Sequence, residues 1–409
     1  MSSSVPDSTD TKTDLKIRPC TLRDLEILEA MAMSDLTSGA EDLRQIRQWY
    51  GLLKGLSFFP NPFQHSFCAY VAEQGDRLRG MVQVSPFNKT RSTWRVERLI
   101  LVGQSGEEGT VVFPTDVGSQ LIRHCLQAIW EARTWIMEVG VDNDMLLGLS
   151  RQAGFQPLAH LTHWAIAPES LQALAAEPPN LPNLLPVSNA DAGLLHQLDT
   201  FSMPPTLRQV FDRHVIDFRR NLVIALGNSL RCWMDRTEIV RGYVFQPQRK
   251  AAIGYFHIEL CRDGSQPHVA DLTVHPEYTW LYPELLRQMA QVTQVYSPQS
   301  LRLTSADYQS EREEYLQQLG AIPTERSLLL SRSVWHKLRE ARPLEGLQLS
   351  DVLQGLQPSR TPIPSRFSLL DYWKQQQFQQ FSAPTDGVSP PERRTPLPKP
   401  PTDEPHGSV

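Results

Sequence analysis

Cysteine is scarce in this chain of 409 residues, and no two cysteines are spaced as a Cys-x-x-Cys pair. The five that occur are odd in number and scattered along the chain, at Cys20, Cys68, Cys125, Cys232 and Cys261. This pattern excludes a disulfide framework and indicates reduced thiols. The histidines are equally dispersed, and neither His160 nor His163 has the neighbours that a metal ligand needs. We therefore expect no metal site.

Long apolar runs and a strong excess of one charge are also absent. No apolar stretch approaches the ~18 residues of a membrane span, and the polar first fourteen residues lack the apolar core of a signal peptide. The formal net charge is -5, whereas a dedicated nucleic-acid binder normally carries a basic face. We therefore expect a cytoplasmic protein that binds neither membranes nor nucleic acids.

Length and apolar content favour two domains. The chain has 409 residues, of which 40% are hydrophobic, and this is too long for one ordinary core. In the first half, apolar periodicity and turn residues predict the following elements in order. They are a strand at 15–18, helices at 21–33 and 41–53, strands at 67–73, 79–86 and 94–102, a helix at 117–132, a strand at 134–139, a helix at 144–154 and a strand at 155–166.

The second half repeats this order of elements. Its pattern predicts helices at 191–198 and 206–220, strands at 229–236, 239–246, 251–261 and 269–274, a helix at 280–295, a strand at 301–305, a helix at 311–319 and a strand at 327–331. We expect an α/β (α+β) protein with two tandem copies of one fold. Each copy is predicted to be a mixed, mostly antiparallel sheet flanked by helices.

Composition sets the expected boundaries of these copies. Prolines gather between the halves and again near the C-terminus, where they favour extended chain. We predict a disordered lead-in at 1–14, an N-terminal domain at 15–168, a linker at 169–186, a C-terminal domain at 187–340, a helical extension at 341–381 and a disordered Pro-rich tail at 382–409.

The stretch 111–155 carries the chemistry that the sequence suggests. It predicts a loop that opens into a helix, then a strand and a second helix. Free backbone N–H groups and the helix dipole favour an anion at such a helix N-terminus, so we expect a phosphate-bearing cofactor there. Asp116 lies in this turn and is a residue type that often caps a helix, which is the alternative explanation for its presence.

This order of elements resembles the GNAT superfamily of acyl-CoA-dependent N-acyltransferases. The segment WRVERLILV at 94–102 is similar to the family's fourth strand, and FPTDVGSQLI at 113–122 occupies its pyrophosphate loop. Asn143 matches an asparagine that follows the fifth strand. In the second half, DLTVHPEY at 271–278 and QQLGA at 317–321 resemble the ends of the fourth strand and of the last helix.

The resemblance implies a bound acetyl-CoA in the N-terminal copy and an amine acceptor, either a small molecule or a protein. The residues that it assigns to the cofactor are Leu99, Ile100, Leu101, Val117, Gly118, Ser119 and Asn143. The second copy carries bulky Trp280, Leu281 and Tyr282 where the family has glycines. We therefore expect the second copy to be a degenerate structural partner.

Catalysis in this family needs a base for the amine and benefits from an acid for the thiolate. Glu97, on the predicted fourth strand, is the candidate base; the alternative is a solvated carboxylate paired with Arg95 or Arg98. The family's usual acid is a tyrosine, and Ser150 stands at that position here. A second hypothesis is therefore a non-catalytic scaffold that acts through its cleft or through aromatic residues at 360–381, a segment suited to a protein partner.

Overall fold

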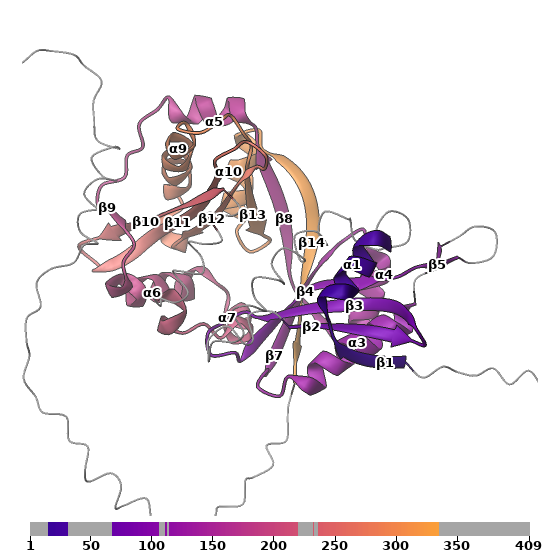
Figure 1. Ribbon diagram of the computed structural model, residues 1–409. Coiled ribbons are helices and arrows are strands. Elements are labelled where there is room, and N and C mark those ends of the chain that lie inside the picture. The colour runs from indigo at the N-terminus through magenta and orange to yellow at the C-terminus, as the bar shows by residue number, and fades with distance from the viewer. Residues whose placement is uncertain are drawn as a thin grey trace, which may run out of the picture. The chain divides into compact units, whose positions relative to one another are not determined.

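The structure is a computed structural model, and it describes residues 15–31, 68–105, 111–112, 114–219, 232 and 236–334 (Figure 1). These residues belong to one compact unit, Met1–Leu338. The predicted lead-in, the helix predicted at 41–53, the extension at 341–381 and the tail at 382–409 lie outside the described residues. So does most of the strand predicted at 229–236.

The N-terminal half forms its elements in the predicted order. They are β1 (Leu15–Pro19), α1 (Leu22–Met31), β2 (Cys68–Gln74), β3 (Arg77–Pro86), β4 (Thr93–Leu101), β5 (Gln104–Ser105), β6 (Val111–Val112), α3 (Thr115–Ala128), β7 (Thr134–Gly140), α4 (Asp144–Gln152) and β8 (Gln156–Ile166). The short β5–β6 ribbon is not predicted by the sequence pattern. It lies in the loop between β4 and α3.

The elements of the C-terminal half differ from the prediction in two places. Its elements are α5 (Pro168–Ala175), β9 (Leu184–Pro186), α6 (Ala192–Ser202), α7 (Pro205–Phe211), the 3-10 helix η3 (Val215–Phe218), β10 (Thr237–Gln246), β11 (Ala251–Cys261), β12 (His268–Val274), α9 (Leu281–Thr293), β13 (Leu301–Ala306), α10 (Ser310–Gln318) and β14 (Ile322–Ser333).

The end of the predicted linker is a strand, because Leu184 to Pro186 pair with β10. The helix predicted at 206–220 is too long. It ends at Phe211, because Asp212 adopts a left-handed backbone with φ of 44° and closes the last turn by donating its N–H to the Arg208 carbonyl.

The strands form one twelve-stranded sheet in which the two halves exchange their last strands. The order is β1-β2-β3-β4-β7-β14-β8-β13-β12-β11-β10-β9. Strand β14 of the C-terminal half inserts between β7 and β8 of the N-terminal half, and β8 in turn lies between β14 and β13 (Figure 1). Among the strands that the structure describes, only β4–β7 and β12–β13 are parallel pairs. The predicted α/β class, with a mixed and mostly antiparallel sheet, is confirmed.

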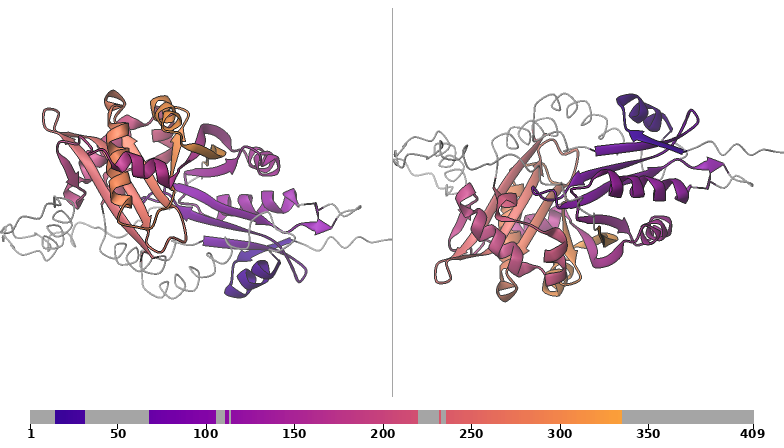
Figure 2. Two further views of the ribbon diagram at one scale, coloured as in Figure 1. Left: turned by 90° about the horizontal axis from the view of Figure 1, so that it is seen from above. Right: turned by 90° about the horizontal axis from the view of Figure 1, so that it is seen from below.

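Helices cover both faces of each half of the sheet. In the N-terminal half α1 packs on one face, against Met81 and Ile100, and α3 packs on the other, against Val82 and Leu101 (Figure 2). In the C-terminal half α9 and α6 contact β11 and β12, and they belong to separate apolar clusters. Successive side chains of a strand point to opposite faces of the sheet, so each strand contributes to two separate cores.

We expect Gly80→Ala to destabilise the fold by about 1–3 kcal/mol. A Cβ atom at Gly80 would lie 2.8 Å from the carbonyl oxygen of Ile100, and the β3–β4 ladder fixes that strand. Gly148 is the matched control, because a Cβ there meets nothing within 4 Å. Gly148→Ala within α4 should stabilise by about 0.5–1 kcal/mol. Urea unfolding of both variants measures the difference, and effects of the same sign would contradict this packing.

Candidate functional site

The first candidate site is the point where the parallel strands β4 and β7 separate. They pair from Thr93–Thr134 to Val96–Met137 and then diverge. On the other side of β4, Val84 pairs with Val96 and Gln83 with Arg98, so Glu97 is the extra residue of a β-bulge. A bulge bends its strand and interrupts the ladder. The bulge therefore places Glu97 at the opening of the β4–β7 splay.

The carboxylate of Glu97 is exposed and has two polar neighbours. Its Oε1 accepts a hydrogen bond of 2.5 Å from the Ser85 hydroxyl. Its Oε2 lies 3.7 Å from Nε of Arg95. The ion pair that the sequence offered as the alternative to catalysis is thus present with Arg95. It is a loose contact on an accessible surface, so the carboxylate remains reachable by a substrate.

The first turn of α3 lies at the open end of this splay, where a Cβ atom at Gly118 would be 3.4 Å from the Leu101 side chain. The residue before the helix is Pro114, which makes no side-chain hydrogen bond to the helix N-terminus. Asp116 lies within the first turn, with its side chain exposed. The alternative in which Asp116 caps the helix is therefore wrong. Among the residues that the structure describes, no side chain accepts from the first N–H groups of α3, which lie at the position expected for phosphates.

Most of the other predicted cofactor residues belong to the core. Leu99, Leu101 and Val117 lie in the apolar cluster under α3, and Ile100 points into the opposite core beside α1. Gly118 is buried, and a Cβ there would come within 2.3 Å of the Leu149 side chain. Its role in this structure is the close packing of α3 on α4.

Three further predicted residues form hydrogen bonds within α4 or between α3 and α4. The Ser119 hydroxyl lies 3.5 Å from the Gln152 side chain, and Asn143 caps α4 by accepting from the Leu146 N–H at 3.0 Å. Ser150 is fully buried, and its hydroxyl donates to the Leu147 carbonyl at 2.8 Å. In this position the Ser150 hydroxyl is engaged within α4.

A continuous line of polar contacts leads from Glu97 across the exchanged strands, and we call it the seam chain. It consists of Glu97, Arg95, Glu138, His163 and Thr304. Arg95 donates to Glu138 at 3.2 Å, and His163 contacts the other Glu138 oxygen through Nε2 at 2.8 Å. The Nδ1 of His163 lies 3.0 Å from the Thr304 hydroxyl. The chain thus crosses from β4 of one half to β13 of the other.

Glu138 and His163 form the centre of the seam chain, and each changes the other's proton affinity. The hydrogen bond that His163 donates to Glu138 raises the pKa of His163 above its usual value, although burial opposes this. Burial would raise the pKa of Glu138, but hydrogen bonds from His163 and from Ser327, which donates at 2.6 Å, lower it overall. The pair is therefore charged in mildly acidic solution.

The second candidate site is a cavity of about 380 Å³ in the C-terminal half, which we call the C-terminal cavity. It opens where β12 and β13 separate after their last pair, Ala270–Leu303. Asp271 and Thr304, the next residue of each strand, both line it. Helix α6 and the segment 211–218 form other parts of its wall. Thr304 is also the last member of the seam chain.

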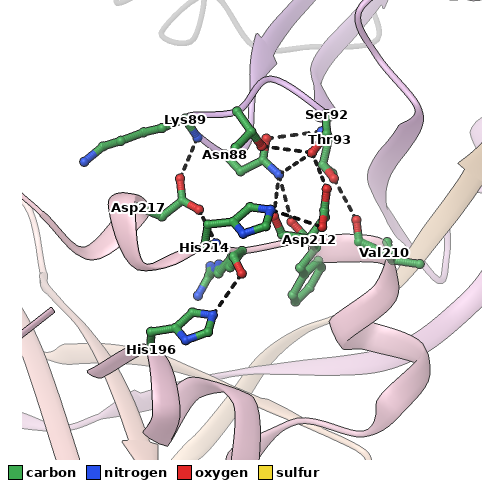
Figure 3. A network of polar contacts seen from close by, with 12 residues as sticks. Asn88, Lys89, Ser92, Thr93, His196, Val210, Asp212, His214 and Asp217 are labelled. Carbon is green, nitrogen blue, oxygen red and sulfur yellow. Dashed lines mark hydrogen bonds and ion pairs between the residues drawn. The ribbon is translucent and has the colours of Figure 1, made fainter. Parts of the chain in front are cut away.

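The N-terminal half holds the segment 210–219 in place, as Figure 3 shows. Asn88, in the turn between β3 and β4, donates to the carbonyls of Phe211 and Asp212 at 3.1 and 2.9 Å. Ser92 donates to the Asp212 carboxylate at 2.6 Å, and the Thr93 hydroxyl donates to the carbonyl of Val210 at 2.8 Å. The wall of the C-terminal cavity therefore depends on a turn of the other half.

A second set of contacts fixes the following turn. The Lys89 N–H donates to Asp217 at 2.6 Å (Figure 3). The Lys89 ammonium donates to the Ile216 carbonyl at 2.8 Å. Asp217 also accepts from the His214 N–H at 2.7 Å. These bonds anchor both ends of the short segment that carries Arg213 into the cavity wall.

The splay of the C-terminal half differs from that of the N-terminal half. Strand β12 pairs with β11 in an unbroken register, from Gly254–Val274 to Glu259–Val269, so it carries no bulge there. The first turn of α9 is apolar, with Leu281 and Tyr282 buried and Trp280 half exposed. These three side chains lie at the start of α9, where the sequence predicts that they obstruct a cofactor diphosphate. Their effect on cofactor binding stays a prediction.

Two general features of the described residues bear on function. No helix among them is long and apolar enough to cross a membrane. The same stretches contain no group of three or more histidine, cysteine, aspartate or glutamate side chains arranged to hold a metal ion.

We expect His163→Gln to remove a pH-dependent contribution to stability. A raised histidine pKa stabilises the fold below the usual value of 6.5 and loses its effect as the pH rises through the raised value. A lowered glutamate pKa stabilises above the usual value of 4.5 and loses its effect as the pH falls through the lowered value. The variant should thus lose most stability, about 1–2 kcal/mol, between these two pH values.

Thermal unfolding from pH 4.5 to 9 measures this difference. His160→Gln is the control, because His160 lies on the same strand and is exposed beside Asp307. A His163→Gln deficit that stays constant over the whole pH range would show that the ion pair contributes nothing.

Comparisons with known proteins give likenesses of fold. No family model and no curated protein matches the sequence. Among solved structures, a tandem GNAT protein from the clavulanic acid biosynthesis pathway is 13% identical at a TM-score of 0.49, and the match covers 78% of this chain and 98% of that chain. A GCN5-related N-acetyltransferase from Sphaerobacter thermophilus is 11% identical at a TM-score of 0.47, covering 78% and 95%. Structural similarities with so low a sequence identity and TM-score do not indicate an activity for this chain.

Proposed function

We propose that this protein transfers an acyl group from acyl-CoA to an amine, with the donor bound in the N-terminal half. The observation that carries the proposal is the β-bulge at Glu97, which lies where β4 and its parallel partner β7 separate. The splay offers a slot for an extended chain such as pantetheine. The bulge presents a carboxylate at the entrance of this slot.

The N-terminus of α3 is the proposed place for the donor's diphosphate. Its N-cap residue, Pro114, makes no side-chain hydrogen bond to it, and the helix dipole attracts an anion there. The C-terminal half is a poorer place for the same ligand, because buried Leu281 and Tyr282 occupy the first turn of α9. We therefore assign acetyl-CoA to the N-terminal copy and leave the second copy a different role.

In the proposed reaction, the amine nitrogen attacks the carbonyl carbon of the thioester. Glu97 takes the proton that the nitrogen loses, directly or through one water molecule. The C–S bond then breaks, the amide forms, and CoA leaves as a thiolate that takes a proton from solvent. Backbone N–H groups freed from the ladder at the bulge would stabilise the oxyanion of the intermediate.

A second candidate function is supported by the position of Ser150. Because its hydroxyl is buried and donates to Leu147, it supplies no acid to the splay. A protein that binds acyl-CoA or an amine without turnover would need none. The segment 360–381, proposed as the contact with a protein partner, lies outside the described residues.

Calorimetry with acetyl-CoA tests the donor site, and we expect one site per chain of micromolar affinity. Thr115→Pro removes the first N–H of α3 at a position where proline fits a helix, and should weaken binding about tenfold or more. Asp116→Asn removes an exposed carboxylate beside the diphosphate and should tighten binding, most clearly at low salt. Glu169→Gln is the control, since Glu169 lies exposed in the first turn of α5. If Thr115→Pro and Asp116→Asn both bind like the parent chain, the donor site lies elsewhere.

The rate of acyl transfer tests the role of Glu97. Glu97→Gln keeps the size of the side chain but removes the base, and should lower kcat about 100-fold or more with little change in acetyl-CoA affinity. Glu169→Gln should leave the rate unchanged. A parent chain that binds acetyl-CoA but transfers nothing to any amine in a broad panel would favour the non-catalytic candidate.

A further inference from the structure

The C-terminal cavity plays no part in the proposed donor site, yet its wall carries several ionisable groups. Two of them form an ion pair of zero net charge, in which Arg213 donates to the buried Asp199 at 2.9 Å. Two others face each other, with Nδ1 of His257 at 3.5 Å from the Asp271 carboxylate. These four side chains therefore offer each other most of the charge compensation that they need.

Arg312 of α10 is the exception. It is only 5% exposed, it lines the cavity, and it forms no salt bridge with any residue that the structure describes. Its Nη1 donates to the Leu272 carbonyl at 3.1 Å and to the Gln309 side chain at 3.3 Å. Its Nε is buried and has no hydrogen-bond partner. One positive charge of the cavity wall is thus held by neutral oxygens alone.

A buried guanidinium without a carboxylate is costly, because neutral hydrogen bonds replace only part of its hydration. Burial accordingly lowers the pKa of Arg312 below its usual value. Asp271 attracts Arg312 through space, but its contact is with His257. An anion entering the cavity would supply the missing charge, and guanidinium–carboxylate pairs are among the stronger polar contacts in proteins.

The remainder of the wall limits the kind of anion. Leu161, Leu198, Met203 and Phe211 line the cavity together with the charged groups. The volume of about 380 Å³ suits a small organic molecule. A bare inorganic anion would leave the apolar part of the wall uncovered.

We propose that the C-terminal cavity binds a small organic carboxylate, whose carboxylate group pairs with Arg312 and whose apolar body contacts Leu161, Leu198 and Phe211. The site is separate from the donor site, so it holds whether or not the N-terminal half transfers an acyl group. It gives the second half of the chain a ligand of its own.

The test uses the full chain and three probes: phenylacetate, its neutral analogue phenylacetamide, and inorganic phosphate. We expect phenylacetate to bind saturably at one site and to raise the unfolding temperature, and we expect the other two to do neither. Arg312→Met keeps the length of the side chain without its charge and should weaken phenylacetate binding at least tenfold. Equal binding of phenylacetate and phenylacetamide, or phenylacetate binding unchanged in Arg312→Met, would overturn the proposal.

A second variant covers the case in which Arg312→Met fails to fold. Thr273 lines the cavity from β12, and Thr273→Phe should fill the space and abolish phenylacetate binding while Arg312 stays in place. Retained binding in a folded Thr273→Phe chain would also overturn the proposal. Acetyl-CoA calorimetry on the same samples separates the two sites, because loss of one ligand should leave the affinity for the other within a factor of about two.

Discussion

The hydrogen bonds between β14 and its two neighbours are the constraint on which the rest of the structure depends. Strand β14 pairs with β7 over Ser327–Ser333 and with β8 over Ile322–Ser331. Without it, β7 and β8 would each expose an open edge, and open edges invite pairing with other chains. Because β8 also pairs with β13, each half completes the sheet of the other. The seam chain follows this exchange, because it runs from Glu138 of β7 through His163 of β8 to Thr304 of β13.

Local patterns in the sequence were sufficient to predict most elements. The alternation in TWRVERLIL and the apolar stripe of α3 predict β4 and α3 closely. The early end of α7 was missed because an aspartate in the left-handed conformation is rare and carries no clear signal. The exchange of β8 and β14 was missed for a different reason. Strand order follows from which edges meet in space, and periodicity along a chain does not encode it.

Some residues of the candidate sites could be predicted from the sequence, and others could not. Glu97 was proposed because the family resemblance places a base on the fourth strand, and the bulge that positions it appears only in the register with β3. Glu138 is the single charged residue of the apolar strand TWIMEVG, and it could have been singled out. Arg312 could not, because it lies in SEREEYLQQ, which looks like a solvated helix. Its burial depends on β12 and on the cavity, which are distant in sequence.

The exchange also sets an order of events during synthesis. Strand β7 ends at Gly140, and the strand that pairs with it begins at Ile322, about 180 residues later. At roughly 5–20 residues per second, the ribosome needs on the order of ten to forty seconds to cover this distance. During that time the N-terminal half has its helices and β1–β4, but its central edge stays open. Strand β14 can therefore take its place between β7 and β8 only after nearly the whole described chain has been synthesised.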